Sequence, residues 1–225
     1  MPINQLSQCY RKANRMIGVL PVGSIPGRAG QHATIFWSLP RDGHALWRER
    51  DLSCWKSEAS ELWPDMAPFL TGIAQHEDMT LAHYAHGTLK TPVAPGLAHI
   101  GDAAHRASPQ LGQGANMALL DAYALVWALT RAEDVNRALT LYARSRRWHV
   151  WLYQLLSAAF TPQYQSDSAV LPVVRDRLLM PLSKLPPLPH MLSQLVCGSL
   201  VPPVAGEAYI GGVPVGLGRQ APERF

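Results

Sequence analysis

The chain has 225 residues, a formal net charge of +4, 48% hydrophobic residues and 16% charged residues. The charged share is below the roughly one quarter usual in globular domains, which favours a large buried surface or a surface covered by a partner. The longest basic run is Arg146-Arg147, so the sequence gives little support for nucleic-acid binding.

The cysteines and the N-terminus favour a cytoplasmic protein. Cys9, Cys54 and Cys197 are far apart and follow no CxxC pattern, which is typical of reduced, isolated thiols. The first ten residues are polar and lack the apolar segment of a signal peptide. No apolar run approaches the ~18 residues that a membrane-spanning helix needs.

The N-terminal region predicts two strands and two helices. Residues 16–20 and 32–39 are apolar and rich in β-formers, and a turn signal follows at 40–43, so we expect antiparallel neighbours in one sheet. Residues 51–63 have apolar side chains at helical spacing, and Pro64 ends that pattern. A second, shorter helix is expected over 65–72.

The next segment predicts a return to a buried strand. Residues 79–85 are typical of another strand, and a turn follows at 92–96. Residues 97–100 form a short apolar run, the length of a buried strand end, directly before Asp102. His83 and His86 have no acidic or cysteine partner at metal-binding spacing, so we expect no metal site.

Residues 101–115 form a glycine-rich connection between that strand and a helix that begins near Asn116. A fixed Asp102 carboxylate is an acceptor suited to a sugar hydroxyl. Gly112 and Gly114 let the backbone turn sharply and a flat ligand come close. The unpaired N–H groups of the first helical turn can stabilise an anionic oxygen. The spacing alone leaves open an ordinary connection in which Asp102 is a local turn or capping residue.

Two long helices follow. Residues 116–129 are almost wholly apolar, which predicts burial on all sides, with Asp121 as a buried acceptor bonded to backbone or to an arginine. A second helix is expected over 135–160, ended by Thr161-Pro162. Its arginines are expected on a solvated face or in salt bridges: Arg137, Arg144, Arg146 and Arg147.

The C-terminal part predicts shorter helical pieces at 170–185 and 189–200 and an irregular tail from Val201, rich in proline and glycine. Scattered basic residues on apolar helices permit membrane-surface contact. A packed helical cap is the favoured interpretation of this region.

The string from Gly101 to Ala122 closely resembles the second flavin motif of the FAD-dependent monooxygenases of the p-hydroxybenzoate hydroxylase type. The resemblance rests on Gly101-Asp102-Ala103-Ala104-His105, Pro109, Gly112-Gln113-Gly114-Ala115-Asn116 and Asp121-Ala122. It implies that Asp102 binds the ribityl chain of FAD. It also implies that a set of loop and helix residues lines the flavin, with backbone amides near its N1/O2 edge: Pro109, Leu111, Gly112, Gly114, Ala115 and Asn116.

The resemblance covers nearly all of this chain but only the C-terminal part of the family's architecture. The GxGxxG fingerprint, which binds the ADP half of FAD after an N-terminal strand, does not occur in this sequence. We therefore expect an α+β chain: a partial, Rossmann-like FAD-binding monooxygenase fold with a remnant antiparallel substrate-domain sheet. The expected parts are a substrate-domain portion over 1–91, an FAD-binding portion over 92–132, a helical region over 133–200 and an irregular tail over 201–225.

By resemblance, the function is that of a monooxygenase that uses FAD, NAD(P)H and O2 to insert one oxygen atom into a small aromatic or apolar substrate. A partner chain could supply the missing βαβ unit. Two alternatives stay open: a catalytically inactive remnant that binds a partner or a small ligand, and a membrane-peripheral helical protein that keeps the motif as scaffold. The sequence indicates no catalytic acid or base.

Overall fold

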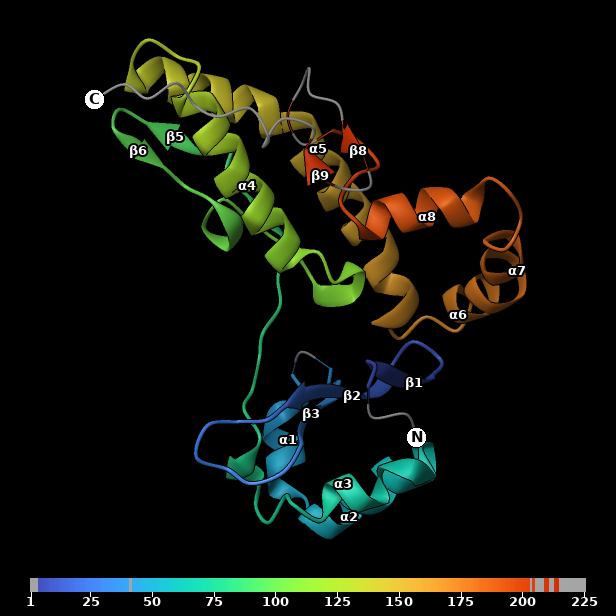
Figure 1. Cartoon of the computed structure of the whole chain (residues 1–225). Coiled ribbons are helices and arrows are strands. Elements are labelled where there is room, and N and C mark those ends of the chain that lie inside the picture. Colours follow the sequence, from blue (N-terminus) through green and yellow to red (C-terminus); the bar gives the residue numbers. More distant parts are fainter. Residues whose placement is uncertain (1–3, 41, 203, 205–208, 211–212, 215–225) are drawn as a thin grey trace. The chain divides into compact units, whose positions relative to one another are not determined.

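The computed structural model describes residues 4–40, 42–202, 204, 209–210 and 213–214, and the chain is a mixed α and β protein. The chain divides into two compact units. The first comprises Met1–His83 and Thr161–Arg175, and the second comprises Tyr84–Phe160 and Asp176–Phe225. Figure 1 shows the elements of each unit.

The first unit contains a three-stranded antiparallel sheet in the order β1 (Ser7–Arg11), β2 (Arg15–Gly23), β3 (His32–Trp37). The expected pairing of the second and third strands is confirmed, and β1 was not expected. Gly18 lies opposite Phe36, and a Cβ on Gly18 would lie 2.1 Å from the Phe36 ring. The ring therefore occupies space that only glycine leaves open.

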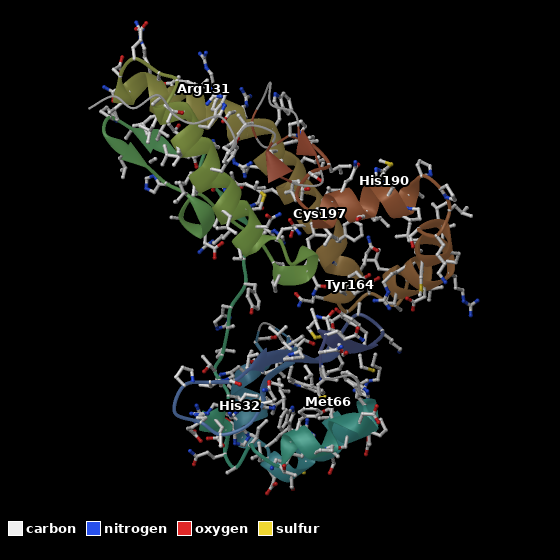
Figure 2. The ribbon with its side chains drawn as sticks, in the orientation of Figure 1. His32, Met66, Arg131, Tyr164, His190 and Cys197 are labelled. Atoms are coloured by element: carbon white, nitrogen blue, oxygen red, sulfur yellow. The ribbon has the colours of Figure 1, made fainter. Side chains whose placement is uncertain are left out.

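Short helices cover one face of this sheet (Figure 1). They are α1 (His44–Glu49), α2 (Leu52–Leu62), the 3₁₀ turn η1 (Pro64–Met66) and α3 (Ala67–Leu70). The predicted helices over 51–63 and 65–72 are confirmed, and Asp51 caps α2 by accepting from the Ser53 N–H at 2.7 Å. The core between sheet and helices holds Ile17, Val19, Trp47, Trp55, Ala59, Met66, Leu70 and Ile73 (Figure 2).

The predicted strand over 79–85 is wrong. After a short 3₁₀ turn, η2 (His76–Asp78), these residues have no regular structure. Within the described ranges no strand pairs with them, and Leu81 and Tyr84 are exposed. A β-forming composition is not sufficient where no neighbouring strand is present.

In the second unit, short strand pairs surround the motif. β4 (Gly87–Thr88) pairs with β7 (His105–Arg106), and β5 (Val93–Ala94) pairs with β6 (Leu97–Ala98), both antiparallel. The expected buried strand over 97–100 is therefore only partly correct. β6 ends at Ala98, and Leu97 and Ile100 are exposed.

Two long helices form the rest of this unit's core: α4 (Gly114–Leu129) and α5 (Val135–Tyr164), whose last turn belongs to the first unit. Their buried contacts include Ala124, Ala128, Ala138 and Tyr142 in one cluster. Met117 and Val150 lie in a second cluster with Leu195. The expected helices are thus present, with boundaries that differ by a few residues.

The prediction that the first of these helices is buried on all sides is wrong. Ala115, Leu119, Ala122, Val126 and Leu129 form an exposed stripe along α4, which we call the α4 stripe. The steps of four and three residues between them place all five on one face. Apolar composition alone does not reveal which face lacks a neighbour.

The expected end of α5 at Thr161-Pro162 is also wrong, because the helix continues through Pro162 to Tyr164. Proline removes one helical N–H, and the neighbouring Gln165 N–H still bonds to the Thr161 carbonyl at 2.8 Å. The last turn is held by aromatic contacts: the Tyr164 ring lies 5.1 Å from Tyr10, and the Arg175 guanidinium lies 4.8 Å from the Tyr164 ring.

The C-terminal helical pieces are confirmed as α6 (Leu171–Val174), a π turn η5 (Arg175–Leu179), α7 (Met180–Leu182) and α8 (Leu188–Val196). Most of the tail from Val201 lies outside the described residues, apart from the strand pair β8 (Tyr209–Ile210) and β9 (Val213–Pro214). None of the described helices has the length and apolar character needed to cross a bilayer.

Candidate functional site

Asp102 lies on a tight turn, the 3₁₀ element η3 (Gly101–Ala103), between β6 and β7. Gly101 has a φ of +57°, and a Cβ there would lie 3.0 Å from the Cβ of Ala118 on α4. The Ala104 N–H donates to the Gly101 carbonyl at 2.9 Å and closes the turn. Glycine is needed here both for the left-handed backbone and for the close approach of α4.

The Asp102 side chain is exposed, and its carboxylate has no hydrogen-bond partner in the part of the chain that the structure describes. It does not cap the turn on which it lies. Of the alternative that Asp102 is a local turn or capping residue, the structure therefore bears out the turn position but shows no capping hydrogen bond from its side chain. Its carboxylate is available to accept hydrogen bonds from a ligand.

The glycine-rich loop lies between the turn and α4. The 3₁₀ element η4 (Pro109–Leu111) leads to Gly112, which has a φ of +62° and donates its N–H to the Pro109 carbonyl at 2.8 Å. The positions that a Cβ would take on Gly112 and Gly114 have no atom within 4 Å. The loop is therefore open on this side and could receive a flat ligand.

The N-terminus of α4 has no side-chain cap, although Gln113 is the capping residue. Gln113 is instead bonded elsewhere. Its Nε2 donates to the Val196 carbonyl at 2.6 Å, and its Oε1 accepts from Asn116 Nδ2 at 2.9 Å. Among the residues that the structure describes, no side chain accepts from the N–H groups of the first turn, at Gly114, Ala115 and Asn116, which therefore favour a negative group.

The residues predicted to line the ligand thus lie in two adjoining segments of one unit. Pro109, Gly112, Gly114 and Ala115 are exposed, whereas Leu111 and Asn116 are half-buried. The Asn116 side chain is bonded to Gln113, so only its backbone N–H is offered at the helix start.

A buried polar network lies beneath the turn. The Asp121 carboxylate is fully buried and accepts at Oδ2 from the Gly101 N–H at 2.7 Å and from His105 Nε2 at 2.6 Å. Its Oδ1 accepts from Arg146 Nε at 2.6 Å. The prediction that Asp121 is a buried acceptor for backbone and an arginine is confirmed.

Burial acts to raise the pKa of Asp121, but the hydrogen bond from His105 and the charge of Arg146 outweigh it, so the pKa lies below its ordinary value. Asp121 therefore carries a negative charge at neutral pH. Arg146 is itself 3% exposed, so the expectation of a solvated arginine is wrong at this position, while that of a salt bridge is confirmed.

The network continues to His149. Arg146 Nη1 lies 3.1 Å from His149 Nδ1, and His149 Nε2 lies 3.0 Å from the Gly198 carbonyl. A guanidinium only donates and a carbonyl only accepts, so His149 is neutral with its proton on Nε2. Burial, followed by the charge of Arg146, lowers the pKa of His149 to about 4.

Sequence reasoning did not identify His105, Gln113, Arg146 and His149 as parts of this arrangement. His105 and Gln113 lie inside the quoted motif, which was the available signal. Arg146 and His149 meet the motif only through the packing of α4, α5 and the segment after α8.

Residues 10–154 match the FAD binding domain family, and this range includes the Asp102 turn, the glycine-rich loop and the side chains of the buried network. The chain belongs to this family. Its cofactor is FAD, as expected, and the resemblance to the FAD-dependent monooxygenases of the p-hydroxybenzoate hydroxylase type is confirmed.

Relatives in this family include 6-methylpretetramide 4-monooxygenase of Streptomyces rimosus, 26% identical over 183 residues, which are 79% of this chain and 44% of the relative. A second is the 3-(3-hydroxy-phenyl)propionate/3-hydroxycinnamic acid hydroxylase of Burkholderia cenocepacia, 30% identical over 119 residues, which are 51% of this chain and 22% of the relative. The chain therefore spans less than half the length of either protein.

The fold is similar to that of solved FAD-dependent enzymes. HpxO from Klebsiella pneumoniae, solved with FAD and uric acid, has a TM-score of 0.64 at 18% identity, covering 88% of this chain and 49% of that chain. PqsL from Pseudomonas aeruginosa, a probable FAD-dependent monooxygenase, has a TM-score of 0.62 at 19% identity, and the match covers 78% of this chain and 49% of that chain.

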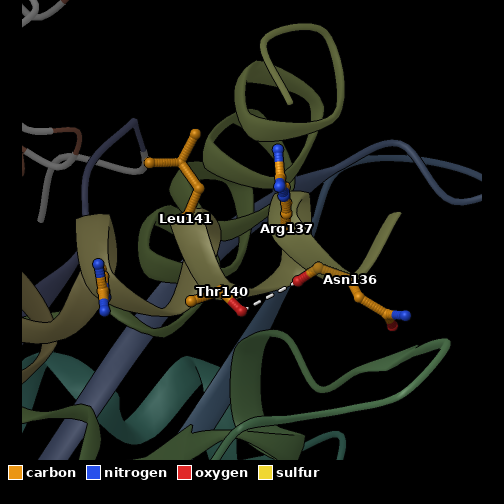
Figure 3. Close-up of a pocket in the computed structure, with 5 residues that line it drawn as sticks. Asn136, Arg137, Thr140 and Leu141 are labelled. Carbon is orange, nitrogen blue, oxygen red and sulfur yellow. Dashed lines mark hydrogen bonds between the residues drawn. The ribbon is translucent and has the colours of Figure 1, made fainter. Parts of the chain in front are cut away.

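The surface also has a hollow of about 390 Å³ on α5, lined by Asn136, Arg137, Thr140, Leu141 and Arg144 (Figure 3). It contains no residue of the Asp102 turn or of the loop. Arg137 is bonded to Glu133 and Asp134, so its charge is already compensated. Among the described residues, no group of three histidine, cysteine or acidic side chains could hold a metal.

Proposed function

We propose that this chain provides the part of a FAD-dependent monooxygenase that binds the riboflavin half of FAD. The observation that carries the proposal is the exposed Asp102 carboxylate, without a hydrogen-bond partner among the described residues, on a turn that packs against α4, a helix whose start has no side-chain cap. The whole protein would use NAD(P)H and O2 to insert one oxygen atom into an aromatic or apolar substrate. FAD would supply the redox chemistry when bound.

The residues present fit the riboflavin half of FAD. Asp102 would accept hydrogen bonds from ribityl hydroxyls. The first-turn N–H groups of α4 would stabilise negative charge at the N1/O2 edge of the ring. Gly112 and Gly114, open on one side, would admit the flat ring, and Pro109 and Leu111 would lie beside it. These residues bind and orient the cofactor, and none of them acts as an acid or base.

We further propose that a βαβ unit carrying the ADP-binding fingerprint completes the site, either in a longer protein or on a partner chain. The α4 stripe supports this, because an exposed apolar face of this length is typical of a surface that another element covers. In this arrangement the chain would be a partial Rossmann-like fold. Residues 1–91 would be the substrate-domain portion, 92–132 the FAD-binding portion and 133–200 a helical cap.

The family match does not favour the alternative of a catalytically inactive, partner-binding or membrane-peripheral remnant. The exposed Asp102 carboxylate and the open space beside both loop glycines support the flavin-binding proposal.

The test is titration of the purified chain with FAD, followed by flavin fluorescence, for the wild type and Asp102→Ala. The proposal predicts binding that weakens by about tenfold or more in the variant, since a hydrogen bond to a charged group is lost. Asp65→Ala, at another exposed aspartate, is the matched control and should bind as the wild type does. Equal binding by the wild type and Asp102→Ala would refute the assignment.

A further inference from the structure

The Asp102 turn is held from below by one buried carboxylate. Asp121 Oδ2 accepts from the N–H of Gly101, one residue before Asp102, and from the ring of His105, three residues after it. Both ends of the turn are therefore bonded to a single oxygen atom. The turn itself contributes one closing hydrogen bond, from the Ala104 N–H to the Gly101 carbonyl.

Arg146 on α5 fixes the carboxylate from the other side. Its Nε donates to Asp121 Oδ1 at 2.6 Å. Arg146 is in turn held by His149, whose Nε2 donates to the Gly198 carbonyl. The orientation of the Asp102 turn thus depends on two helices and on the segment after α8.

We propose that Asp121, held by Arg146, is a positioning residue that sets Asp102 in the direction from which it binds the ribityl chain. This inference rests on the proposed function of Asp102. Asp121 is fully buried, so a ligand on the surface cannot reach its carboxylate and it would act through the turn.

The chemistry of the site requires a carboxylate rather than an amide. Three donors, namely the Gly101 N–H, the His105 ring and Arg146, converge on its two oxygens. In Asp121→Asn, the amide NH2 must face either Arg146 or the Gly101 N–H. Neither group can accept a hydrogen bond, so one donor always faces another donor.

A purely structural role does not explain the arrangement well. A buried ion pair contributes little net stability relative to well-packed apolar groups, because desolvation offsets the attraction. What the pair supplies is a fixed direction for the two bonds to the turn. Asp121→Asn preserves side-chain size but leaves the buried Arg146 charge without its partner, so it should lower stability as well as change the direction and mobility of residues 101–105.

The decisive experiment is a double-mutant cycle on FAD binding with Asp102→Ala and Asp121→Asn. If Asp121 acts through Asp102, Asp121→Asn weakens binding by about tenfold in the wild-type background and has almost no further effect in the Asp102→Ala background. Thermal stability should change additively in the same proteins. Additive losses in binding would overturn the proposal.

Two controls separate positioning from general destabilisation. Leu139→Ala removes a buried side chain on α5, seven residues before Arg146, and should lower stability with unchanged FAD affinity. Arg146→Lys keeps the charge without the Nε donor, and should give part of the Asp121→Asn effect.

Amide hydrogen exchange tests the positioning role of Asp121 in the absence of flavin. Asp121→Asn should speed exchange at Gly101 and Ala104 while leaving the Ala124–Ala128 region of α4 unchanged. Unchanged exchange at the turn would refute the positioning role. If the wild-type chain does not bind FAD, the proposed function of Asp102 fails, and the exchange result still decides whether Asp121 fixes the turn.

Discussion

Gly101 and Ala118 approach so closely that a Cβ on Gly101 would lie 3.0 Å from the Cβ of Ala118. This contact joins the Asp102 turn to the first turns of α4. It brings the Gly101 N–H within 2.7 Å of Asp121, one helical turn further along α4. The geometry of the candidate site therefore depends on the absence of a side chain at one position.

Gly101→Ala should destabilise the second unit by about 1–2 kcal/mol from the left-handed backbone alone, with a further loss from the contact with Ala118. Combining Gly101→Ala with Ala118→Gly removes the close contact. The double variant should therefore recover only the part of the stability loss that the contact with Ala118 causes. Thermal unfolding of the two single variants and the double variant measures both parts. An unchanged melting temperature in Gly101→Ala would contradict the geometry of the turn.

The neutral His149 predicts a loss of stability on acidification. Its pKa is lowered from the ordinary 6.5 to about 4, so between these values the unfolded chain binds a proton that the folded chain does not. The stabilisation is fully present above about pH 6.5 and is lost as pH falls toward 4. A pKa shift of this size corresponds to a loss on the order of 3 kcal/mol in the free energy of unfolding.

His149→Gln tests whether His149 causes this pH dependence of stability. A glutamine side chain can accept a hydrogen bond from Arg146 and donate one to the Gly198 carbonyl without titrating. Denaturant unfolding at pH 7 and pH 4 should show a smaller pH dependence in this variant than in the wild type. His190→Gln, at an exposed histidine of α8 (Figure 2), is the matched control and should not reduce it. An identical pH dependence in all three proteins would exclude His149 as the source.

In the first unit, the close contact between Gly18 and Phe36 predicts that Gly18→Ala is strongly destabilising, by roughly 1–3 kcal/mol of overpacking. Combining it with Phe36→Leu should restore part of this loss, because the aromatic ring is the group that the new methyl meets. A double-mutant cycle in chemical denaturation gives the coupling. Additivity would show that the ring does not fill the space above Gly18.

The α4 stripe predicts a surface that matters for assembly and little for the stability of the chain itself. Leu119→Lys with Val126→Lys should change unfolding free energy by less than about 1 kcal/mol, since both side chains are already exposed. The same variant should fail to associate with a separately produced βαβ segment from a family relative. Size-exclusion chromatography of the mixture checks this, and intact association would exclude the stripe as the docking face.

Periodicity and turn chemistry were sufficient for the elements whose neighbours lie close in the chain. The helix after Asp51 follows from apolar spacing, and the pairing of β2 with β3 follows from two β-forming runs that are neighbours in the chain. Elements that depend on distant partners were not predictable. Residues 79–85 have a strand composition but no neighbouring strand in the described structure, and the apolar sequence of α4 does not show that one face is exposed.

The candidate site likewise contains residues that the local sequence indicates and residues that depend on distant partners. Asp102 and the loop glycines could be singled out as candidates because they lie in one continuous motif string. Asp121 could be assigned a buried partner, but its choice of Arg146 over Arg144 or Arg147 depends on how α5 is rotated against α4. The role of His149 depends on the carbonyl of Gly198, which lies 49 residues away in the chain.

The most direct test of the central claim asks which half of FAD the chain binds. FMN, which carries the isoalloxazine ring and ribityl chain, should displace FAD from the purified chain, and Asp102→Ala should weaken FMN binding by about tenfold or more. ADP should not displace FAD, because the chain lacks the GxGxxG fingerprint that binds the ADP half. Displacement of FAD by ADP, with FMN having no effect, would contradict the account.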